Sequence, residues 1–189
     1  ATQEAQVFGR LRQRCLLLIE AAREVNVDLS IDAEEADRLE ISLKLFESLY
    51  RDPITAGWDG LGLVVQGYSK RAIAIFAWLA RLAAEVGDRI PLRLVKGAYW
   101  DTEIKLTQQA GLEEFPVFTR KSSTDVSYHA CANRLLEYRD TIYPQFATHN
   151  AYTASVIVEL AGDDKEGFEF QCLHGMGDTL YDQVVTQDK

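Results

Sequence analysis

The sequence lacks an excess of basic charge and any long apolar run near its N-terminus. It has 20 Lys and Arg residues against 29 Asp and Glu residues, which gives a formal net charge of −9. Nucleic-acid-binding domains normally carry a basic stripe, so the composition disfavours that class. The apolar run at residues 15–19 is too short to span a membrane, and no signal-peptide pattern is present.

Cysteine is scarce: Cys15, Cys131 and Cys172 are far apart and odd in number. No CxxC pair occurs, so neither a disulfide framework nor a metal site is expected. A reducing, cytoplasmic location fits this pattern best. The sequence begins at Ala1 without an initiator methionine, and we expect it to be part of a longer protein.

Apolar segments alternate along the chain in a strand-then-helix order. Strands are predicted at residues 27–32, 61–68, 92–100 (including an exit loop), 143–150 and 168–177. Helices are predicted at residues 6–24, 33–50, 69–87, from 101 to about 110, at 124–138, at 151–161 and at the C-terminus, with an irregular stretch at 111–123. This order indicates an α/β fold with a parallel sheet, in a single domain over residues 1–189.

Two architectures contain such a sheet: an open doubly wound sheet and a (β/α)8 barrel. No GxGxxG motif follows an early strand, which removes the main signal for a dinucleotide-binding doubly wound fold. Polar residues instead follow nearly every predicted strand: Asp32, Gln66, Arg93 with Lys96, His149 and His174. A barrel active site is built from many strand ends, so the pattern favours a barrel. A complete barrel needs about 250 residues, so these 189 residues predict a partial one.

The run from Arg93 to Trp100 is the most specific one in the sequence. It combines two cations, a glycine that lets a ligand approach the backbone, and two flat aromatic rings. A ligand site is one interpretation. The alternative places Arg93 in a buried salt bridge and Trp100 in the core. Asp32 likewise fits either a site or a helix N-cap with Glu35 as its capping-box partner.

Two further groups have weaker signals. Arg120 and Lys121 lie beside hydroxyl residues and could contact phosphate, although a solvated loop is the commoner outcome. Cys172 and His174 would share one face of a strand. They lack the further ligands of a zinc site and the third group of a catalytic triad, so a core cysteine is the default interpretation.

Five runs in order resemble the proline dehydrogenase domain of bacterial proline utilisation A proteins. They are IDAEEADRLEISL, RLVKGAYWDTEIK, FPVFTRKSSTDVSY, YPQFATHNA and FEFQCLHGMG. The resemblance implies a distorted (β/α)8 barrel that holds FAD at the C-terminal ends of its strands, of which this chain would contain about strands three to seven. It also implies oxidation of L-proline to Δ1-pyrroline-5-carboxylate by hydride transfer to flavin N5.

The resemblance further implies a role for each matching residue. Arg93 would lie near flavin N5, and Asp32 would order the substrate mouth. Tyr99 and Leu173 would pack against the proline ring. The cofactor would contact Gln66, Val95, Lys96, Gly97, Ala98, Trp100, Thr148 and His149.

Several features of the family lie outside these residues. The family has a substrate-binding lysine in an earlier strand, paired arginines after the eighth strand, and an aldehyde dehydrogenase domain. We therefore expect the isolated chain to have little activity, with quinone or another electron acceptor serving the full-length protein. The family also leaves open a peripheral position at the inner membrane. Two other hypotheses remain: a non-flavin barrel enzyme acting on a phosphorylated metabolite, and a non-catalytic barrel remnant.

Overall fold

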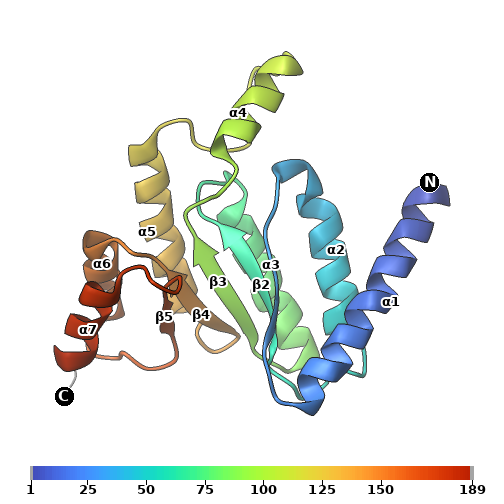
Figure 1. The fold of residues 1–189 in the computed structure, drawn as a ribbon, viewed down its shortest axis with the longest axis horizontal. Helices are drawn as coiled ribbons and strands as arrows, with labels where there is room; N and C mark the ends of the chain where they lie inside the picture. The colour runs from blue at the N-terminus through green and yellow to red at the C-terminus, as the bar shows by residue number, and fades with distance from the viewer. Residues whose placement is uncertain (1, 188–189) are drawn as a thin grey trace.

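The computed structural model describes residues 2–187, in which strands and helices alternate (Figure 1). No helix in this range is long and apolar enough to cross a membrane. The elements are α1 (Thr2–Glu24), β1 (Leu29–Ile31), η1 (Ala36–Arg38), α2 (Leu39–Tyr50), β2 (Leu61–Gln66), α3 (Ala72–Val86), β3 (Ile90–Val95), α4 (Trp100–Gln109), α5 (Lys121–Glu137), β4 (Ile142–Ala147), α6 (Ala151–Ala161), β5 (Glu169–Gln171) and α7 (Asp178–Gln187).

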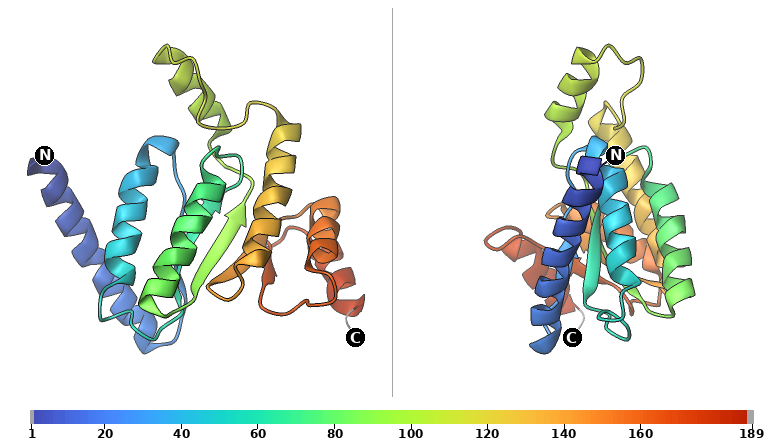
Figure 2. Two further views of the ribbon diagram at one scale, coloured as in Figure 1. Left: turned by 180° about the vertical axis from the view of Figure 1, so that it is seen from behind. Right: turned by 90° about the vertical axis from the view of Figure 1, so that its right-hand side faces the viewer.

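The five strands form one parallel sheet in the order β1-β2-β3-β4-β5. The strand order does not reverse, as it would at the switch point of a doubly wound sheet. Helices α3 and α5 lie behind the sheet in Figure 1 and in front of it in the reversed view of Figure 2. The sheet is therefore wound as in a barrel wall, which confirms the predicted partial barrel. The numbering of its strands as three to seven stays a prediction.

Side chains of successive residues in each strand point to opposite faces of the sheet. The face toward the helices is apolar and belongs to the core, with fully buried Leu61, Leu92, Leu94 and Phe146. The other face carries a row of paired residues across the strands. This row runs through Val64, Arg93, Gln145 and Glu169. One surface of the sheet thus stabilises the fold, and the other presents polar groups.

The predicted helix at residues 33–50 is wrong at its start. Residues 32–35 are irregular, a single 3-10 turn begins at Ala36, and the α-helix begins at Leu39. The predicted capping box does not form, because residues 32–35 are not helical and the N-cap of the 3-10 turn is Glu35 instead of Asp32. The carboxylate of Glu103 in α4 accepts a hydrogen bond from the Ala36 amide at 2.6 Å instead. A distant residue therefore decides where this helical segment begins.

Several other boundaries also differ from the predictions; α5, for example, begins at Lys121 within the stretch predicted to be irregular. Helix α3 begins at Ala72, and Ser69 does not cap it, although its hydroxyl accepts a hydrogen bond from the Arg71 amide at 3.2 Å. The predicted end is confirmed, because Gly87 adopts the left-handed conformation with φ 86°. Strand β5 ends at Gln171, so Cys172 and His174 lie in the loop after it and share no strand face. Cys172 is exposed, so the interpretation as a core cysteine is wrong.

Candidate active site

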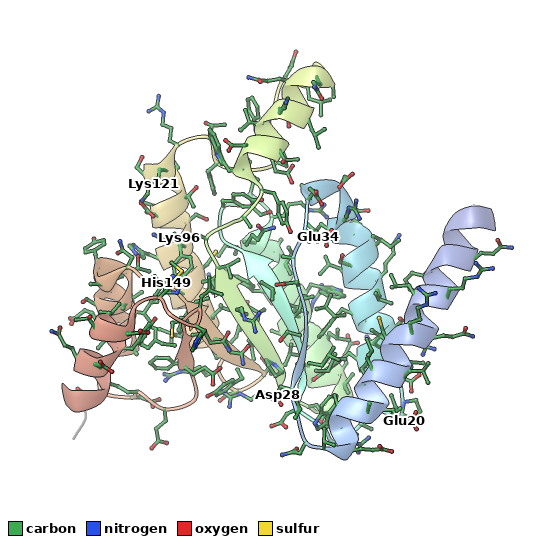
Figure 3. The ribbon with its side chains drawn as sticks, in the orientation of Figure 1. Glu20, Asp28, Glu34, Lys96, Lys121 and His149 are labelled. Carbon is green, nitrogen blue, oxygen red and sulfur yellow. The ribbon has the colours of Figure 1, made fainter. Side chains whose placement is uncertain are left out.

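The C-terminal ends of the strands surround one cavity of about 960 Å³. Figure 3 shows Lys96 and His149 at the ends of the neighbouring strands β3 and β4, away from Asp28 at the other end of the sheet. The predicted site residues that line this cavity are Asp32, Gln66, Arg93, Val95, Lys96, Gly97, Ala98, Tyr99, Thr148, His149 and Leu173. Five separate strand ends therefore contribute to a single site.

Gln66 connects the loops that follow β1 and β3. Its side chain is buried, its Nε2 donates to the Glu34 carbonyl at 2.9 Å, and its Oε1 accepts from the Ala98 amide at 2.8 Å. An amide nitrogen carries two protons, so one N–H of Gln66 has no role in this link. Gln66 thus holds two loops of the cavity in a fixed relation.

Arg93 projects from β3 across the inner face of the sheet. Its Nε donates to the Gln171 side-chain oxygen on β5 at 2.6 Å. Within residues 2–187 Arg93 has no carboxylate partner, so the alternative interpretation as a buried salt bridge is wrong. The half-buried guanidinium therefore keeps its positive charge available to the cavity that it lines.

Lys96 is held by an acidic residue of α5. Its Nζ lies 2.6 Å from Asp125 Oδ1, and Lys121 Nζ lies 2.6 Å from the other oxygen of the same carboxylate. The hydrogen bonds from Lys121 and Lys96 lower the pKa of Asp125. The ion pair between Lys96 and Asp125 fixes the direction of the Lys96 side chain at the mouth of the cavity. Lys121 itself is exposed.

Gly97 provides a bare segment of backbone beside these cations. Its φ is 151°, and a Cβ atom at this position would lie 2.4 Å from the buried Tyr68 ring. Tyr99 follows on the cavity wall. Trp100 does not line the cavity: its side chain is partly exposed, and its indole N–H donates to the Phe118 carbonyl at 3.0 Å. Trp100 thus belongs neither to the cavity nor to the core.

The loops after β4 and β5 are joined through His149. Its Nε2 accepts a hydrogen bond from the Leu173 amide at 2.9 Å. A nitrogen that accepts in this way carries no proton, so the ring proton of the neutral side chain lies on Nδ1. Thr148 is buried, and its hydroxyl accepts from the Asn150 amide at 3.1 Å. Leu173 is largely exposed at the cavity edge.

Sequence reasoning missed several residues of the cavity wall. Gln171 is the most informative of them because it holds Arg93. The alternation of Glu169 and Gln171 along one strand was a signal that both face inward. Asn150 caps α6 by accepting from the Thr153 amide at 2.9 Å. The other missed lining residues are Ala33, Val64, Ala147 and Cys172.

Comparison with known proteins agrees with this geometry. The sequence profile of the family described as proline dehydrogenase matches residues 2–189. The chain belongs to the proline dehydrogenase family. Among curated members, the bifunctional protein PutA of Salmonella typhimurium is 54% identical over 182 residues, covering 95% of this chain and 14% of that protein. PutA of Rhizobium meliloti is 50% identical over 189 residues, covering 99% of this chain and 15% of that protein.

Solved structures of the proline dehydrogenase family share the fold. A mutant proline utilisation A from Bradyrhizobium japonicum matches with a TM-score of 0.94 and 48% identity, over 97% of this chain and 19% of that chain. The protein from Bdellovibrio bacteriovorus, inactivated by N-propargylglycine, matches with a TM-score of 0.92 and 30% identity over the same shares. The chain therefore spans a small part of the length of these relatives.

Proposed function

We propose that this chain forms most of a flavin site that oxidises L-proline to Δ1-pyrroline-5-carboxylate. The observation that carries the proposal is the arrangement of Gln66, Arg93 and His149. They come from three different strand ends and line one cavity. Barrel enzymes build their active sites at this face of the sheet, and the family membership makes proline the preferred substrate.

The residues present fit FAD as the cofactor. The cavity of about 960 Å³ lies at the upper end of the range usual for small-molecule sites, about 300–1,000 Å³. Arg93 and Lys96 add positive charge, which suits both a pyrophosphate and a reduced flavin. Gly97 lines the cavity and carries no side chain of its own, so its cavity-facing backbone can be approached closely, while the Tyr68 ring packs on its other side.

Each residue has a definite task in the proposed reaction. A bound flavin would accept hydride at N5 from the proline carbon next to nitrogen. Arg93 stabilises the negative charge that develops beside it, because a fixed cation needs no reorganisation. Tyr99 and Leu173 hold the proline ring at reacting distance, and Asp32 orders the mouth of the site. Thr148 and His149 support the remainder of the cofactor.

The remaining partners are proposed on the family resemblance. A carboxylate of the substrate is best bound by bidentate arginines. Arg93 is the single arginine among the described residues that line the cavity. We therefore assign this task to other segments of the full-length protein, which also supplies an aldehyde dehydrogenase domain and passes electrons to a quinone or another acceptor. A cytoplasmic location is proposed because Cys15, Cys131 and Cys172 are all free thiols.

The decisive experiment is the substitution Arg93→Ala in the full-length protein. We expect the rate of flavin reduction by proline to fall at least about a hundredfold, the range found when one charge-stabilising donor is removed. The control is Arg81→Ala, which removes an equal charge from the exposed surface of α3. Wild-type reduction by Arg93→Ala, or a colourless protein that binds a sugar phosphate, would refute the proposal.

A further inference from the structure

A chain of polar side chains leads from Arg93 to a carboxylate on the same face of the sheet. Arg93 Nε donates to Gln171 Oε1 at 2.6 Å, and Gln171 Nε2 donates to Glu169 Oε1 at 2.7 Å. Glu169 Oε1 also accepts from Gln145 Nε2 at 3.0 Å, and its other oxygen accepts from the Tyr143 hydroxyl at 3.3 Å. Glu169 thus gathers three neutral donors.

The direction of the Gln171 amide is fixed by the groups at its two ends. A carboxylate only accepts hydrogen bonds, so the amide nitrogen must face Glu169. A guanidinium only donates, so the amide oxygen must face Arg93. In the part of the chain that the structure describes, Glu169 has no cationic partner. Its charge therefore acts on Arg93 through the aligned Gln171 dipole.

The strand register makes room for this contact. Arg93 pairs with Gln145 on β4, and Gln145 pairs with Glu169 on β5. Gln171 lies one inward-facing position further along β5, opposite Ala147. The methyl side chain of Ala147 lets Arg93 reach across β4 to Gln171. The contact occupies Nε and leaves the terminal nitrogens of Arg93 without a hydrogen-bond partner among residues 2–187.

We propose that Glu169 and Gln171 are positioning residues that hold Arg93 in its working orientation, an inference that rests on the proposed flavin site. Gln171 accepts the hydrogen bond from Arg93 Nε, and Glu169 holds Gln171, so the terminal nitrogens of Arg93 stay free for the cavity. Both act through Arg93 and need no contact with cofactor or substrate. Removing the amide of Gln171 frees the guanidinium to rotate, and the positive charge is no longer fixed beside the flavin.

The test compares two glutamines that donate to the same carboxylate oxygen. In the full-length protein, Gln171→Met removes the link to Arg93. Gln145→Met is the matched control, because Gln145 donates to the same Glu169 oxygen but makes no hydrogen bond to Arg93. It is a mild change, since the buried Oε1 of Gln145 has no partner among the described residues. Both variants are compared by the flavin midpoint potential, the visible spectrum and the rate of reduction by proline.

For Gln171→Met we expect the reduction rate to fall about tenfold or more, the effect of losing one hydrogen bond to a charged group. The midpoint potential should also fall, because the cation is no longer fixed beside the reduced flavin. Gln145→Met should change neither quantity appreciably. Equal values for Gln171→Met and Gln145→Met would overturn the inference.

A rescue variant separates positioning from packing. The double variant Glu169→Gln, Gln171→Glu exchanges the amide and the carboxylate, so the new carboxylate accepts from Arg93 and from the new amide. Side-chain size and net charge are unchanged, and we expect the rate to recover from that of Gln171→Met toward that of the parent protein. The potential should stay below that of the parent, because a carboxylate now lies beside Arg93. A folded double variant with no recovery would also overturn the inference. If the flavin of the unsubstituted protein were not reduced by proline, the proposed function would be wrong. The midpoint potential is measured without proline, so it would still test the effect of Gln171 on Arg93.

Discussion

Gly97 is a cavity residue at which close packing leaves no room for a side chain. Its backbone has φ 151°, and an added Cβ would lie 2.4 Å from the Tyr68 ring. Tyr68 is itself buried and cannot move away without disturbing its neighbours. We predict that Gly97→Ala destabilises the protein by about 1–3 kcal/mol, the usual cost of overpacking, and weakens flavin binding. Urea unfolding and flavin titration would measure the two effects.

Gly111 offers a control for the conformational part of this cost. It has φ 64°, and an added Cβ would meet no atom within 4 Å. Gly111→Ala should therefore cost about 1–2 kcal/mol through left-handed strain alone, with flavin affinity unchanged. If Gly97→Ala bound flavin as well as Gly111→Ala does, the bare backbone at Gly97 would have no role in the site.

At the scale of elements, one turn of α5 connects the ends of three strands. The Ser127 hydroxyl donates to the Gly67 carbonyl after β2 at 2.6 Å. The Tyr128 hydroxyl lies 3.2 Å from the carbonyls of Leu94 in β3 and Ala147 in β4. Helix α5 therefore holds together the strand ends that carry the site, in addition to covering the outer face of the sheet.

This connection makes the Tyr128 hydroxyl important for stability. We predict that Tyr128→Phe costs about 1 kcal/mol, because a buried hydroxyl–carbonyl hydrogen bond is lost. Tyr138→Phe is the matched control, since the Tyr138 hydroxyl has no hydrogen bond among the described residues. Urea unfolding of both variants would check this, and equal midpoints would show that the connection contributes nothing.

The Asp125 carboxylate on α5 gives a pH-dependent prediction. Its pKa is lowered by Lys121 and Lys96, so its ionised form is stabilised by folding. Such a group stabilises the protein above its unfolded pKa of about 3.9, and this stabilisation is lost as the pH falls through the lower folded pKa. Asp125→Asn should therefore be less stable than the parent at neutral pH.

The difference in stability between the two proteins should begin to shrink as the pH falls below about 4, where Asp125 of the unfolded parent takes up a proton. It should vanish once the pH lies below the lower pKa of folded Asp125. Urea midpoints measured across this range would test it. A difference in urea midpoint that stayed constant with pH would contradict the stabilising role of ionised Asp125. Since Asp125 is only partly shielded from solvent, added salt should also narrow the gap at neutral pH.

The order of helices and strands could be predicted from the sequence, because the spacing of apolar residues that identifies each element is local. The continuous apolar run at 61–68 predicted β2. The polar residues at the ends of the first four strands predicted the cavity, whereas His174 does not line it. The start of the helical segment after β1 could not be predicted, because Glu103, 67 residues further along, binds the Ala36 amide. Likewise, the partner of Arg93 is 78 residues away in the chain.

Trp100 shows a second limit of sequence reasoning. The family resemblance implied a contact with the cofactor, but α4 begins at this residue, and its indole N–H donates to the Phe118 carbonyl. Whether a residue at the end of a run faces the cavity depends on where the next helix starts. A sequence pattern locates such a boundary only to within a few residues.

For the whole molecule, the main feature is a sheet with two edge strands. Strands β1 and β5 have three residues each and pair on one side only. We predict that the isolated 189-residue chain binds FAD weakly and reduces little or no dye with proline, because its cavity lacks the remaining barrel wall. A visible spectrum and a dye assay beside the full-length protein would measure this. A yellow, fully active isolated chain would contradict it.

The division of each strand between two faces has an evolutionary consequence. Leu92 and Leu94 support the fold, whereas Arg93 between them faces the cavity. Tolerance to substitution should therefore oscillate with a period of two along β3, with stability lost at even positions and chemistry lost at odd ones. Substitutions at the cavity-facing positions, which are every second residue of a strand, can therefore change the reaction of such a barrel while its fold is kept.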